Sequence, residues 1–244
     1  MIKMSLKEKI AGEIERFRNV YTFKEREIPE NIELAKYIDH TLLKPEATPQ
    51  MIEQLCKEAI ENSFYSVCVN SSFLPLVNKI LEGTEVKRAV VIGFPLGSVS
   101  TEVKVFETRW CLQQGVDEFD MVINVGLLKA GLFDEVYNDI KAVVDASQGK
   151  IVKVIIETAL LTEEEKVAAC VLAKEAGAQF VKTSTGFSKS GATVEDVSLM
   201  KFVVGEGMKV KASGGVRTKE IALAMIRAGA DRIGTSSGIK IISE

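Results

Sequence analysis

The sequence predicts an α/β protein that folds as a single (β/α)8 barrel, or TIM barrel, with an extra N-terminal helix. Eight short runs rich in Val and Ile alternate with longer amphipathic stretches along the 244 residues. No Pro-, Gly- or Ser-rich linker interrupts this alternation, which favours one domain over two. Polar residues gather at the carboxyl ends of the runs, where a barrel carries its functional groups. An open doubly wound sheet fits less well, because no GxGxxG pattern follows the first run.

The chain is expected to divide into an N-terminal helical extension, residues 1–34, and a barrel domain, residues 35–244. Four apolar residues at helical spacing predict the extra helix: Leu6, Ile10, Ile14 and Phe17. Ser5 and Glu8 fit a capping box at its start. Charged residues between the apolar ones distinguish this helix from a secretory signal sequence. No run of 18 apolar residues occurs in the sequence, so we expect no membrane span.

The strands and helices of the barrel follow in alternation. The expected strands are residues 36–40, 64–70, 87–94, 118–125, 151–158, 179–185, 209–214 and 231–235. The expected helices are residues 49–61, 101–114, 131–147, 162–176, 193–206 and 217–229. Thr48, Ser100 and Thr162 stand at helix starts, where a side-chain oxygen can cap the free amides. Glycines near several helix ends fit the left-handed residue that often terminates a helix.

Composition narrows the classes of partner and cofactor. The net charge of −3 gives no global basic field for nucleic acid or an anionic membrane. Four widely spaced cysteines without a CxxC pattern predict reduced, buried thiols in a cytoplasmic protein. Zinc sites draw on His and Cys clusters, but the chain has one histidine, His40. The composition leaves a carboxylate-bound Mg²⁺ open, although no spacing of acidic residues calls for one, and we expect no metal.

Two lysines end neighbouring expected strands. Lys182 directly follows the apolar residues Phe180 and Val181, and Lys211 lies at the matching point of the next strand. Neighbouring strands are about 4.8 Å apart, so the two amines can approach closely. Their repulsion and their burial both lower a lysine pKa. A lysine that is neutral near neutral pH can act as a nucleophile.

Acidic residues are expected beside these lysines. Alternation along the strands places Asp120 on the inward face of the fourth strand, and Lys153 with Glu157 on that of the fifth. Asp120 and Glu157 would balance charge and move protons. The competing interpretation is a buried ion-pair network that serves only the fold. Buried ion pairs stabilise a protein poorly compared with apolar packing, which disfavours a purely structural role for so many charges. A nucleophilic amine favours Schiff-base chemistry on a carbonyl compound, with pyridoxal phosphate still open as a user of the lysine.

An anion site is predicted at the loops after the last strands. KASGGVR (211–217) and GTSSG (234–238) end two expected strands in small residues and open helices. Paired glycines allow close backbone approach, and helix N-termini offer free amides to an anion. In barrels, the loops after strands seven and eight often bind phosphate. TSTG (183–186) is a third contributor, and Arg217 fits either an added positive charge or an exposed first-turn residue. The sequence therefore predicts a phosphorylated substrate.

Eight motifs carry a resemblance to a known family. They are IDHTLLKP (38–45), GFPLG (93–97), TEVKVFE (101–107), EFDMVINVG (118–126), KVIIET (153–158), FVKTSTGF (180–187), KASGGVR (211–217) and RIGTSSG (232–238). The chain resembles the deoxyribose-phosphate aldolases, which are metal-independent class I aldolases with a (β/α)8 barrel. The resemblance implies reversible cleavage of 2-deoxy-D-ribose 5-phosphate to acetaldehyde and D-glyceraldehyde 3-phosphate through a lysine Schiff base, without a cofactor.

The resemblance also implies roles for individual residues. Lys182 would form the imine, Lys211 would donate protons and lower the pKa of Lys182, and Asp120 would relay protons. Asp39 and Lys153 would support the relay or contact substrate hydroxyls. The implied phosphate contacts are Gly186, Gly214, Gly215, Gly234, Ser236 and Ser237.

The chain departs from some members of this family at two points. Phe187 stands where some members carry a basic residue, although Lys189 is close by. The chain ends in IISE, whereas some members have a longer tail whose final tyrosine reaches the site. The first departure bears on one phosphate contact and the second on proton transfer.

Two other functions stay open from the sequence. One is a Schiff-base aldolase acting on a different phosphorylated sugar, and the other is a non-catalytic sugar-phosphate-binding barrel. If the protein is an aldolase of either specificity, its expected partners are a phosphorylated sugar and aldehydes, with no nucleic acid and no membrane. We also expect a homo-oligomer, either a dimer or a tetramer.

Overall fold

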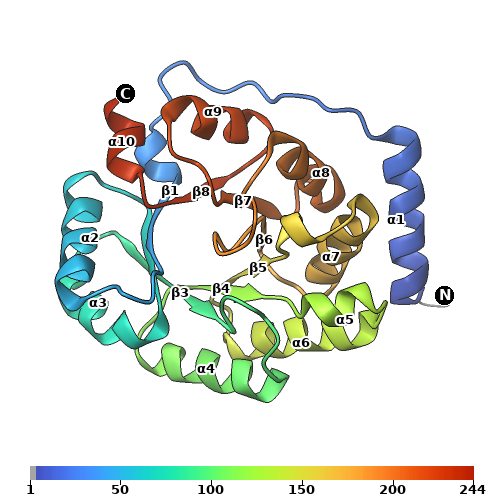
Figure 1. The fold of residues 1–244 in the computed structure, drawn as a ribbon, viewed down its shortest axis with the longest axis horizontal. Coiled ribbons are helices and arrows are strands. Elements are labelled where there is room, and N and C mark those ends of the chain that lie inside the picture. The colour runs from blue at the N-terminus through green and yellow to red at the C-terminus, as the bar shows by residue number, and fades with distance from the viewer. Residues whose placement is uncertain (1–3) are drawn as a thin grey trace.

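Eight parallel strands close into a barrel in the computed structural model, which describes residues 4–244 (Figure 1). The strands are β1 Ile38–Leu42, β2 Ser66–Val69, β3 Lys87–Ile92, β4 Glu118–Val122, β5 Ile151–Ile155, β6 Phe180–Lys182, β7 Lys209–Ser213 and β8 Arg232–Thr235. Each strand pairs with the next along the chain, and β8 pairs with β1 to close the sheet. The predicted (β/α)8 barrel is confirmed, and each expected strand overlaps an observed one.

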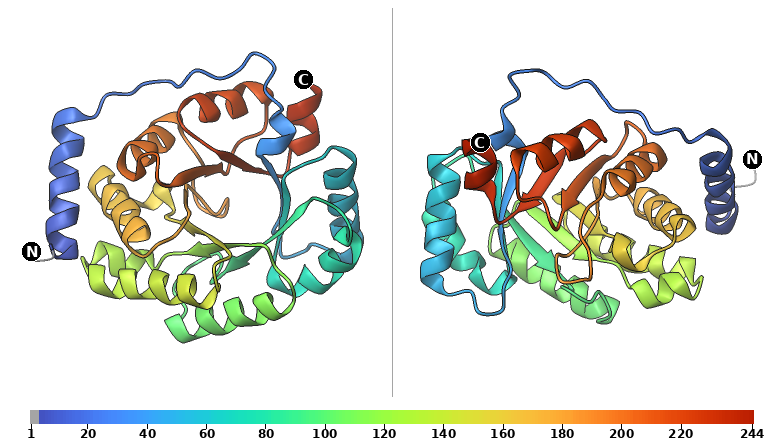
Figure 2. Two further views of the ribbon diagram at one scale, coloured as in Figure 1. Left: turned by 180° about the vertical axis from the view of Figure 1, so that it is seen from behind. Right: turned by 45° about the horizontal axis from the view of Figure 1, so that its top comes forward.

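Helices surround the barrel on its outer side (Figures 1 and 2). They are α2 Pro49–Glu61, α3 Leu74–Leu81, α4 Thr101–Gln113, α5 Val125–Lys129, α6 Phe133–Ala146, α7 Glu163–Glu175, α8 Val194–Val204, α9 Lys219–Arg227 and α10 Gly238–Ser243. Three 3-10 turns add to these: η1 Leu34–Tyr37, η2 Ser71–Phe73 and η3 Thr158–Leu160. The six expected helices match α2, α4 and α6–α9 to within two residues at each end. Among the helices of residues 4–244, none combines the length and apolarity that a membrane crossing requires.

Two of the three expected helix caps are present, whereas the side chain of Ser100 at the start of α4 forms no capping hydrogen bond. The Thr48 hydroxyl accepts a hydrogen bond from the amide of Met51, and Thr162 forms a capping box with Glu165. The prediction omits α3 and α5, which are only eight and five residues long. In α3 the signal is nevertheless present, because its buried residues stand at helical spacing: Leu74, Val77 and Leu81.

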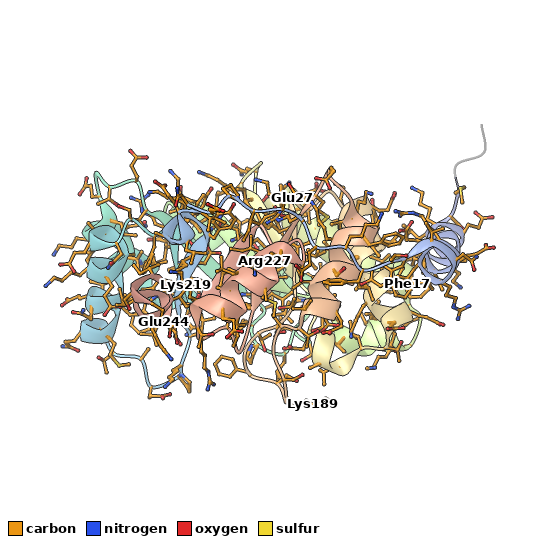
Figure 3. All side chains as sticks on the ribbon, turned by 90° about the horizontal axis from the view of Figure 1, so that it is seen from above. Phe17, Glu27, Lys189, Lys219, Arg227 and Glu244 are labelled. Carbon is orange, nitrogen blue, oxygen red and sulfur yellow. The ribbon has the colours of Figure 1, made fainter. Side chains whose placement is uncertain are left out.

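Helix α1, Leu6–Val20, lies outside the ring and packs against α7 (Figures 1 and 2). The predicted capping box of Ser5 and Glu8 is present at its start. Residues 1–3 of the expected 1–34 extension lie outside the described residues. After α1 the chain crosses the molecule to β1, and Figure 3 shows Glu27 of this segment and Lys189 of the β6–α8 loop on opposite faces. The connecting segment therefore leaves the face of the β6–α8 loop uncovered.

The strands separate an apolar shell from a mixed lumen. Outward side chains of the strands, such as Val90, Phe119 and Val154, belong to one large buried cluster with the helices. Inside the barrel, β2 and β3 contribute a small apolar cluster that includes Cys68, Ala89 and Val91. This dry wall faces the charged side chains of the other strands. Charges in the lumen are thus largely buried, so each of them is costly unless it is paired with a charge of opposite sign.

Candidate active site

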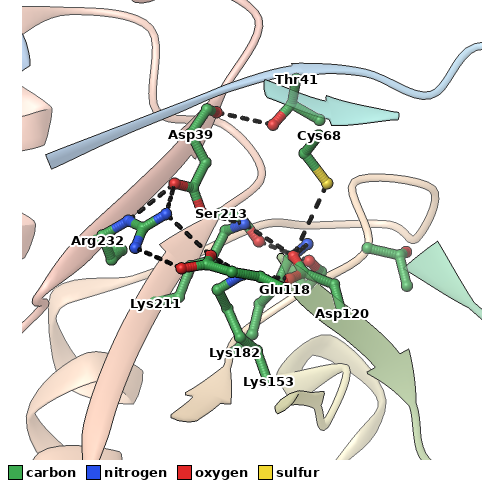
Figure 4. A network of polar contacts seen from close by, with 12 residues as sticks. Asp39, Thr41, Cys68, Glu118, Asp120, Lys153, Lys182, Lys211, Ser213 and Arg232 are labelled. Atoms are coloured by element: carbon green, nitrogen blue, oxygen red, sulfur yellow. Dashed lines mark hydrogen bonds and ion pairs between the residues drawn. The ribbon is translucent and has the colours of Figure 1, made fainter. Parts of the chain in front are cut away.

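Three lysines from adjacent strands converge on the carboxylate of Asp120 in β4 (Figure 4). The Nζ atom of Lys153 lies 2.7 Å from Oδ1, and those of Lys182 and Lys211 lie 2.8 and 2.7 Å from Oδ2. Strand register explains the convergence, because Asp120 pairs with Lys153 and Lys182 pairs with Lys211. All four side chains point into the lumen and are at most 2% exposed. The structure thus brings together four of the five residues that the family resemblance assigned to catalysis and its support.

A second layer of charge lies on the same side of the lumen. Asp39 of β1 forms an ion pair with Lys211 at 2.5 Å and accepts a hydrogen bond from Nε of Arg232 at 2.8 Å. Glu118 of β4 forms an ion pair with Lys153 at 2.6 Å and accepts a hydrogen bond from Arg232 at 3.1 Å. The fifth predicted residue, Asp39, is therefore also in the network. Each of these carboxylates is shared between two basic groups, so neither is an unpaired buried charge.

The pKa values of the three lysines on Asp120 are shifted in different directions. Burial lowers the pKa of Lys182, and the charge of Lys211 adds to this effect. Burial acts in the same direction on Lys211, but the charges of Asp120 and Asp39 outweigh it and raise the pKa of Lys211. The pKa of Lys153 is also raised, because Asp120 and Glu118 outweigh its burial. Of the three amines, Lys182 is therefore the one that most readily becomes neutral.

Asp120 stays ionised despite its burial. Burial by itself raises the pKa of this carboxyl group, but the three lysines that contact it hold its pKa well below the usual range. The thiol of Cys68 lies 3.9 Å from the same carboxylate. Burial and the charge of Asp120 raise the pKa of Cys68, so the thiol carries no charge in the lumen. The prediction of a packed, unreactive thiol at this position agrees with this environment.

A cavity of about 380 Å³ opens at the carboxyl ends of the strands, and Lys182 lines it. The loops after β1, β6, β7 and β8 form its other walls. Five of the six predicted phosphate contacts line the same cavity: Gly186, Gly214, Gly215, Gly234 and Ser236. The sixth, Ser237, precedes α10, and its amide donates to the hydroxyl of Thr235 at 2.9 Å. Arg217 is exposed and also lines the cavity.

Two of these glycines are required by geometry. Gly214 has a φ of 84°, in the left-handed region that favours glycine, and a Cβ atom there would lie 2.9 Å from Cα of Gly191. A Cβ atom on Gly234 would lie 2.9 Å from Cε of Lys211 and 2.9 Å from Cβ of Ser213. Gly234 therefore makes room for the buried lysine in addition to lining the cavity.

The expectation that Glu157 joins the lysines is wrong. β5 ends at Ile155, and Glu157 has a φ of 56°, so the alternation of the strand no longer sets its direction. Its carboxylate instead accepts hydrogen bonds from the hydroxyl of Thr185 at 2.5 Å and from the amide of Thr185 at 3.3 Å. Glu157 thus holds the β6–α8 loop at the edge of the cavity.

Two charged residues of the network were not predicted. Glu118 stands two residues before Asp120, and Arg232 stands two residues before Gly234. Side chains two residues apart on a strand share a face, so Glu118 points inward like Asp120, and Arg232 shares the inward face of Gly234. The sequence pattern therefore already indicated that both charges face the lumen. Over residues 4–244, the His, Cys, Asp and Glu side chains form no group of three or more that could hold a metal ion.

Comparison with known proteins identifies the family. The sequence model of the DeoC/LacD family aldolases matches residues 33–244. The chain belongs to the DeoC/LacD aldolase family. A deoxyribose-phosphate aldolase of Thermotoga petrophila is 55% identical over 243 residues, covering 99% of this chain and 96% of the relative. A second from Thermococcus gammatolerans is 61% identical over 215 residues, covering 86% of this chain and 96% of the relative.

Solved structures agree with this DeoC/LacD assignment. A crystal structure of a protein from Coccidioides immitis matches with a TM-score of 0.94 and 41% identity, covering 100% of this chain and 98% of that chain. A tetrameric deoxyribose-phosphate aldolase of Aeropyrum pernix matches with a TM-score of 0.82 and 32% identity, covering 98% of this chain and 97% of that chain.

Phe187, at which the sequence departs from some members of the family, forms part of the cavity wall. Phe187 lines the cavity and is 49% exposed, and its ring packs edge-on against Phe94 at a centroid distance of 5.3 Å. Lys189, two residues later, is exposed at the tip of the same loop (Figure 3). An aromatic side chain thus forms this part of the cavity wall.

Proposed function

We propose that this protein is a class I aldolase that reversibly cleaves 2-deoxy-D-ribose 5-phosphate to acetaldehyde and D-glyceraldehyde 3-phosphate. The observation that carries the proposal concerns Lys182. Of the lysines on Asp120, it is the one that lines the cavity and the one whose pKa is lowered. A lysine that is both accessible to substrate and readily neutral is what imine formation requires. The relatives named deoxyribose-phosphate aldolases support the choice of substrate.

The reaction follows from the amine chemistry. Neutral Lys182 attacks the C1 aldehyde of the open-chain sugar, and loss of water gives a protonated imine. The C3 hydroxyl passes its proton to the water through which Asp120 relays protons, the C2–C3 bond breaks, and its electrons pass toward the imine nitrogen to give an enamine. D-Glyceraldehyde 3-phosphate leaves, and protonation of the enamine at C2 followed by hydrolysis releases acetaldehyde and restores Lys182.

Proton transfer is assigned to the groups around Lys182. The amines of Lys182 and Lys211 both contact Oδ2 of Asp120, so this oxygen bridges them. In our proposal, Lys211 supplies protons and lowers the pKa of Lys182, and Asp120 relays protons through water. The low pKa of Asp120 supports a relay role over that of a lasting proton acceptor. Asp39 and Lys153 would hold Lys211 and Asp120 in place, respectively.

The phosphate of the substrate is proposed to bind at the loops after β6, β7 and β8. Loop amides, supported by the exposed Arg217, would neutralise its charge. The residues assigned to this site are Gly186, Gly214, Gly215, Gly234, Ser236 and Ser237. Their position on or beside the cavity of Lys182 supports the assignment.

Substrate comparison tests the proposed function. We expect the purified protein to cleave 2-deoxy-D-ribose 5-phosphate, with release of acetaldehyde, much faster than other sugar phosphates. Faster cleavage of a different sugar phosphate would instead identify a Schiff-base aldolase of other specificity. Tight binding of sugar phosphates without any cleavage would identify a non-catalytic binding barrel.

We further propose an arrangement of the whole protein. Residues 35–244 would form the catalytic domain, and residues 1–34 a helical extension of it. Exposed apolar side chains on the β3–α4 loop and on α4 support a contact between subunits in a homodimer or homotetramer: Leu96, Val99, Val103 and Phe106. Sedimentation at the mass of a monomer would contradict this assembly.

Four buried thiols support a cytoplasmic location, which cell fractionation would check.

A further inference from the structure

The charges of the lumen form a closed ring (Figure 4). Lys153 contacts Asp120 at 2.7 Å and Glu118 at 2.6 Å. Arg232 contacts Glu118 at 3.1 Å and Asp39 at 2.8 Å. Lys211 contacts Asp39 at 2.5 Å and Asp120 at 2.7 Å, which returns to the start. Each cation of the ring thus lies between two carboxylates, and each carboxylate lies between two cations.

Lys182 stands outside this ring. Its amine contacts Asp120 at 2.8 Å and none of the other carboxylates of the ring within ion-pair distance. The three carboxylates already balance the three cations of the ring: Lys153, Lys211 and Arg232. A proton on Lys182 would therefore add an uncompensated positive charge to a site shielded from water. The neutral form of Lys182 is the one that leaves the lumen without a net charge.

The lumen side chains of β2 and β3 add no compensating charge. The thiol of Cys68, from β2, is neutral because burial raises its pKa. β3 contributes Ala89 and Val91, which are apolar and buried. The charge balance at Lys182 is therefore set by the six members of the ring.

We infer that Glu118 and Arg232 are positioning residues that close the ring and thereby set the protonation of Lys182. This inference rests on the proposed function, in which Lys182 reacts as a neutral amine. Glu118 and Arg232 do not line the cavity, so they act through the other charges and not on the substrate. A cation–π contact also holds Arg232 in place, because the central carbon of its guanidinium lies 3.4 Å from the ring centroid of Tyr65.

Opposite substitutions should shift Lys182 in opposite directions. Glu118→Gln removes a negative charge, so protonation of Lys182 becomes less favourable and its pKa falls. Arg232→Gln removes a positive charge, so a proton on Lys182 restores the balance and its pKa rises. For a charge at ring distance, each shift should amount to about one pH unit. Glu118→Gln/Arg232→Gln removes one charge of each sign and should return the pKa toward its original value.

Reductive trapping with acetaldehyde and cyanoborohydride measures these shifts. Acetaldehyde carries no titrating group, so the pH at which adduct formation on the Lys182 peptide declines reports the amine itself. Adducts on exposed Lys189 provide an internal reference for the reagent. Glu220→Gln, which removes an exposed acid on α9, is the matched control and should leave the pH dependence unchanged.

The expected result is a downward shift for Glu118→Gln, an upward shift for Arg232→Gln and cancellation in the double variant. Shifts in the same direction, or none, in folded variants would overturn the inference. If Arg232→Gln does not fold, the nearly isosteric Glu118→Gln decides alone, and a decline at the original pH or higher contradicts the ring. Absence of any Lys182 adduct in the unmodified protein would instead reject the proposed function.

Discussion

At the scale of single residues, the cost of burying Lys182 and its reactivity have the same origin. A buried ammonium is unfavourable unless it is paired, and the partner of Lys182, Asp120, is already shared with two other lysines. The amine therefore loses its proton more readily than a lysine in water. Lys153 and Lys211 are equally buried but remain charged, because each has a second carboxylate. The number of carboxylate partners, rather than burial alone, distinguishes the three lysines.

Replacement of Lys182 should separate activity from stability. We expect Lys182→Met to reduce kcat by about 10⁴-fold or more, because the nucleophile is lost. The melting temperature should stay the same or rise, because the ring keeps its charge balance and a desolvated amine is removed. Steady-state kinetics and a thermal melt measure the two effects.

The matched control is Lys209→Met, which removes an exposed lysine near the start of β7 and should change neither quantity. A large fall in the melting temperature of Lys182→Met would show that Lys182 serves the fold, against its assignment as a nucleophile.

The lumen positions of the lysines and of Asp120 could be predicted from the sequence more completely than those of the charged residues around them. Lys182, Lys211 and Asp120 could be located because a charged residue at the end of an apolar strand is conspicuous. Glu157 misled because the strand ends two residues before it, and a left-handed residue follows no alternation. Arg232 was missed because a charge at the start of a strand resembles an ordinary solvent-exposed end.

At the scale of elements, the connection between α1 and the barrel is held mainly by Arg26. Its amide donates to the carbonyl of Arg227 at 2.8 Å, and its Nε donates to the carbonyl of Ile226 at 2.7 Å. Its guanidinium also pairs with Asp231 at 3.1 Å. Asp231 in turn accepts from the amide of Val210 at the start of β7. The extension is therefore linked to the closing strands of the barrel, away from the cavity.

Arg26→Ala should weaken this link without altering catalysis. Loss of the side-chain hydrogen bonds should lower the free energy of unfolding by about 1–3 kcal/mol, while kcat stays unchanged. Urea denaturation and the cleavage assay measure the two. Arg18→Ala is the control, because Arg18 and Glu164 form an exposed pair that should contribute less than about 1 kcal/mol. Equal effects of the two substitutions would contradict an anchoring role for Arg26.

The positions of most elements could be predicted because their signals are local. Dense Val and Ile runs mark the strands, and caps such as Thr48 and Thr162 mark the helix starts. The short helix α5 escaped because five residues give little periodicity, whereas α3 was missed although its buried residues stand at helical spacing. The packing of α1 against α7 could not be predicted, because an amphipathic helix fits any apolar surface.

At the scale of the whole molecule, closure of the barrel brings together charges that are far apart in the sequence. Asp39 and Arg232 are 193 positions apart and yet form an ion pair, because β8 pairs with β1. The sequence indicated that acids and lysines would share a lumen. It could not show that they form a closed ring, because that depends on the register of all eight strands.

The same arrangement predicts the pH dependence of the enzyme. Lys182 has a lowered pKa, so catalysis is expected above that pKa and should be lost as pH falls through it. The pKa values of Asp39 and Asp120 are also lowered, so both carboxylates remain ionised over this range. The acidic decline of kcat/KM should therefore report Lys182 and not the carboxylates.

The most direct test of the central claim is borohydride trapping with 2-deoxy-D-ribose 5-phosphate, followed by peptide mass mapping. We expect one reduced adduct, located on Lys182, and none on Lys153 or Lys211. An adduct on either of those lysines would keep the aldolase chemistry but contradict the charge argument. Protein that turns over the substrate and yields no adduct at all would contradict the Schiff base itself.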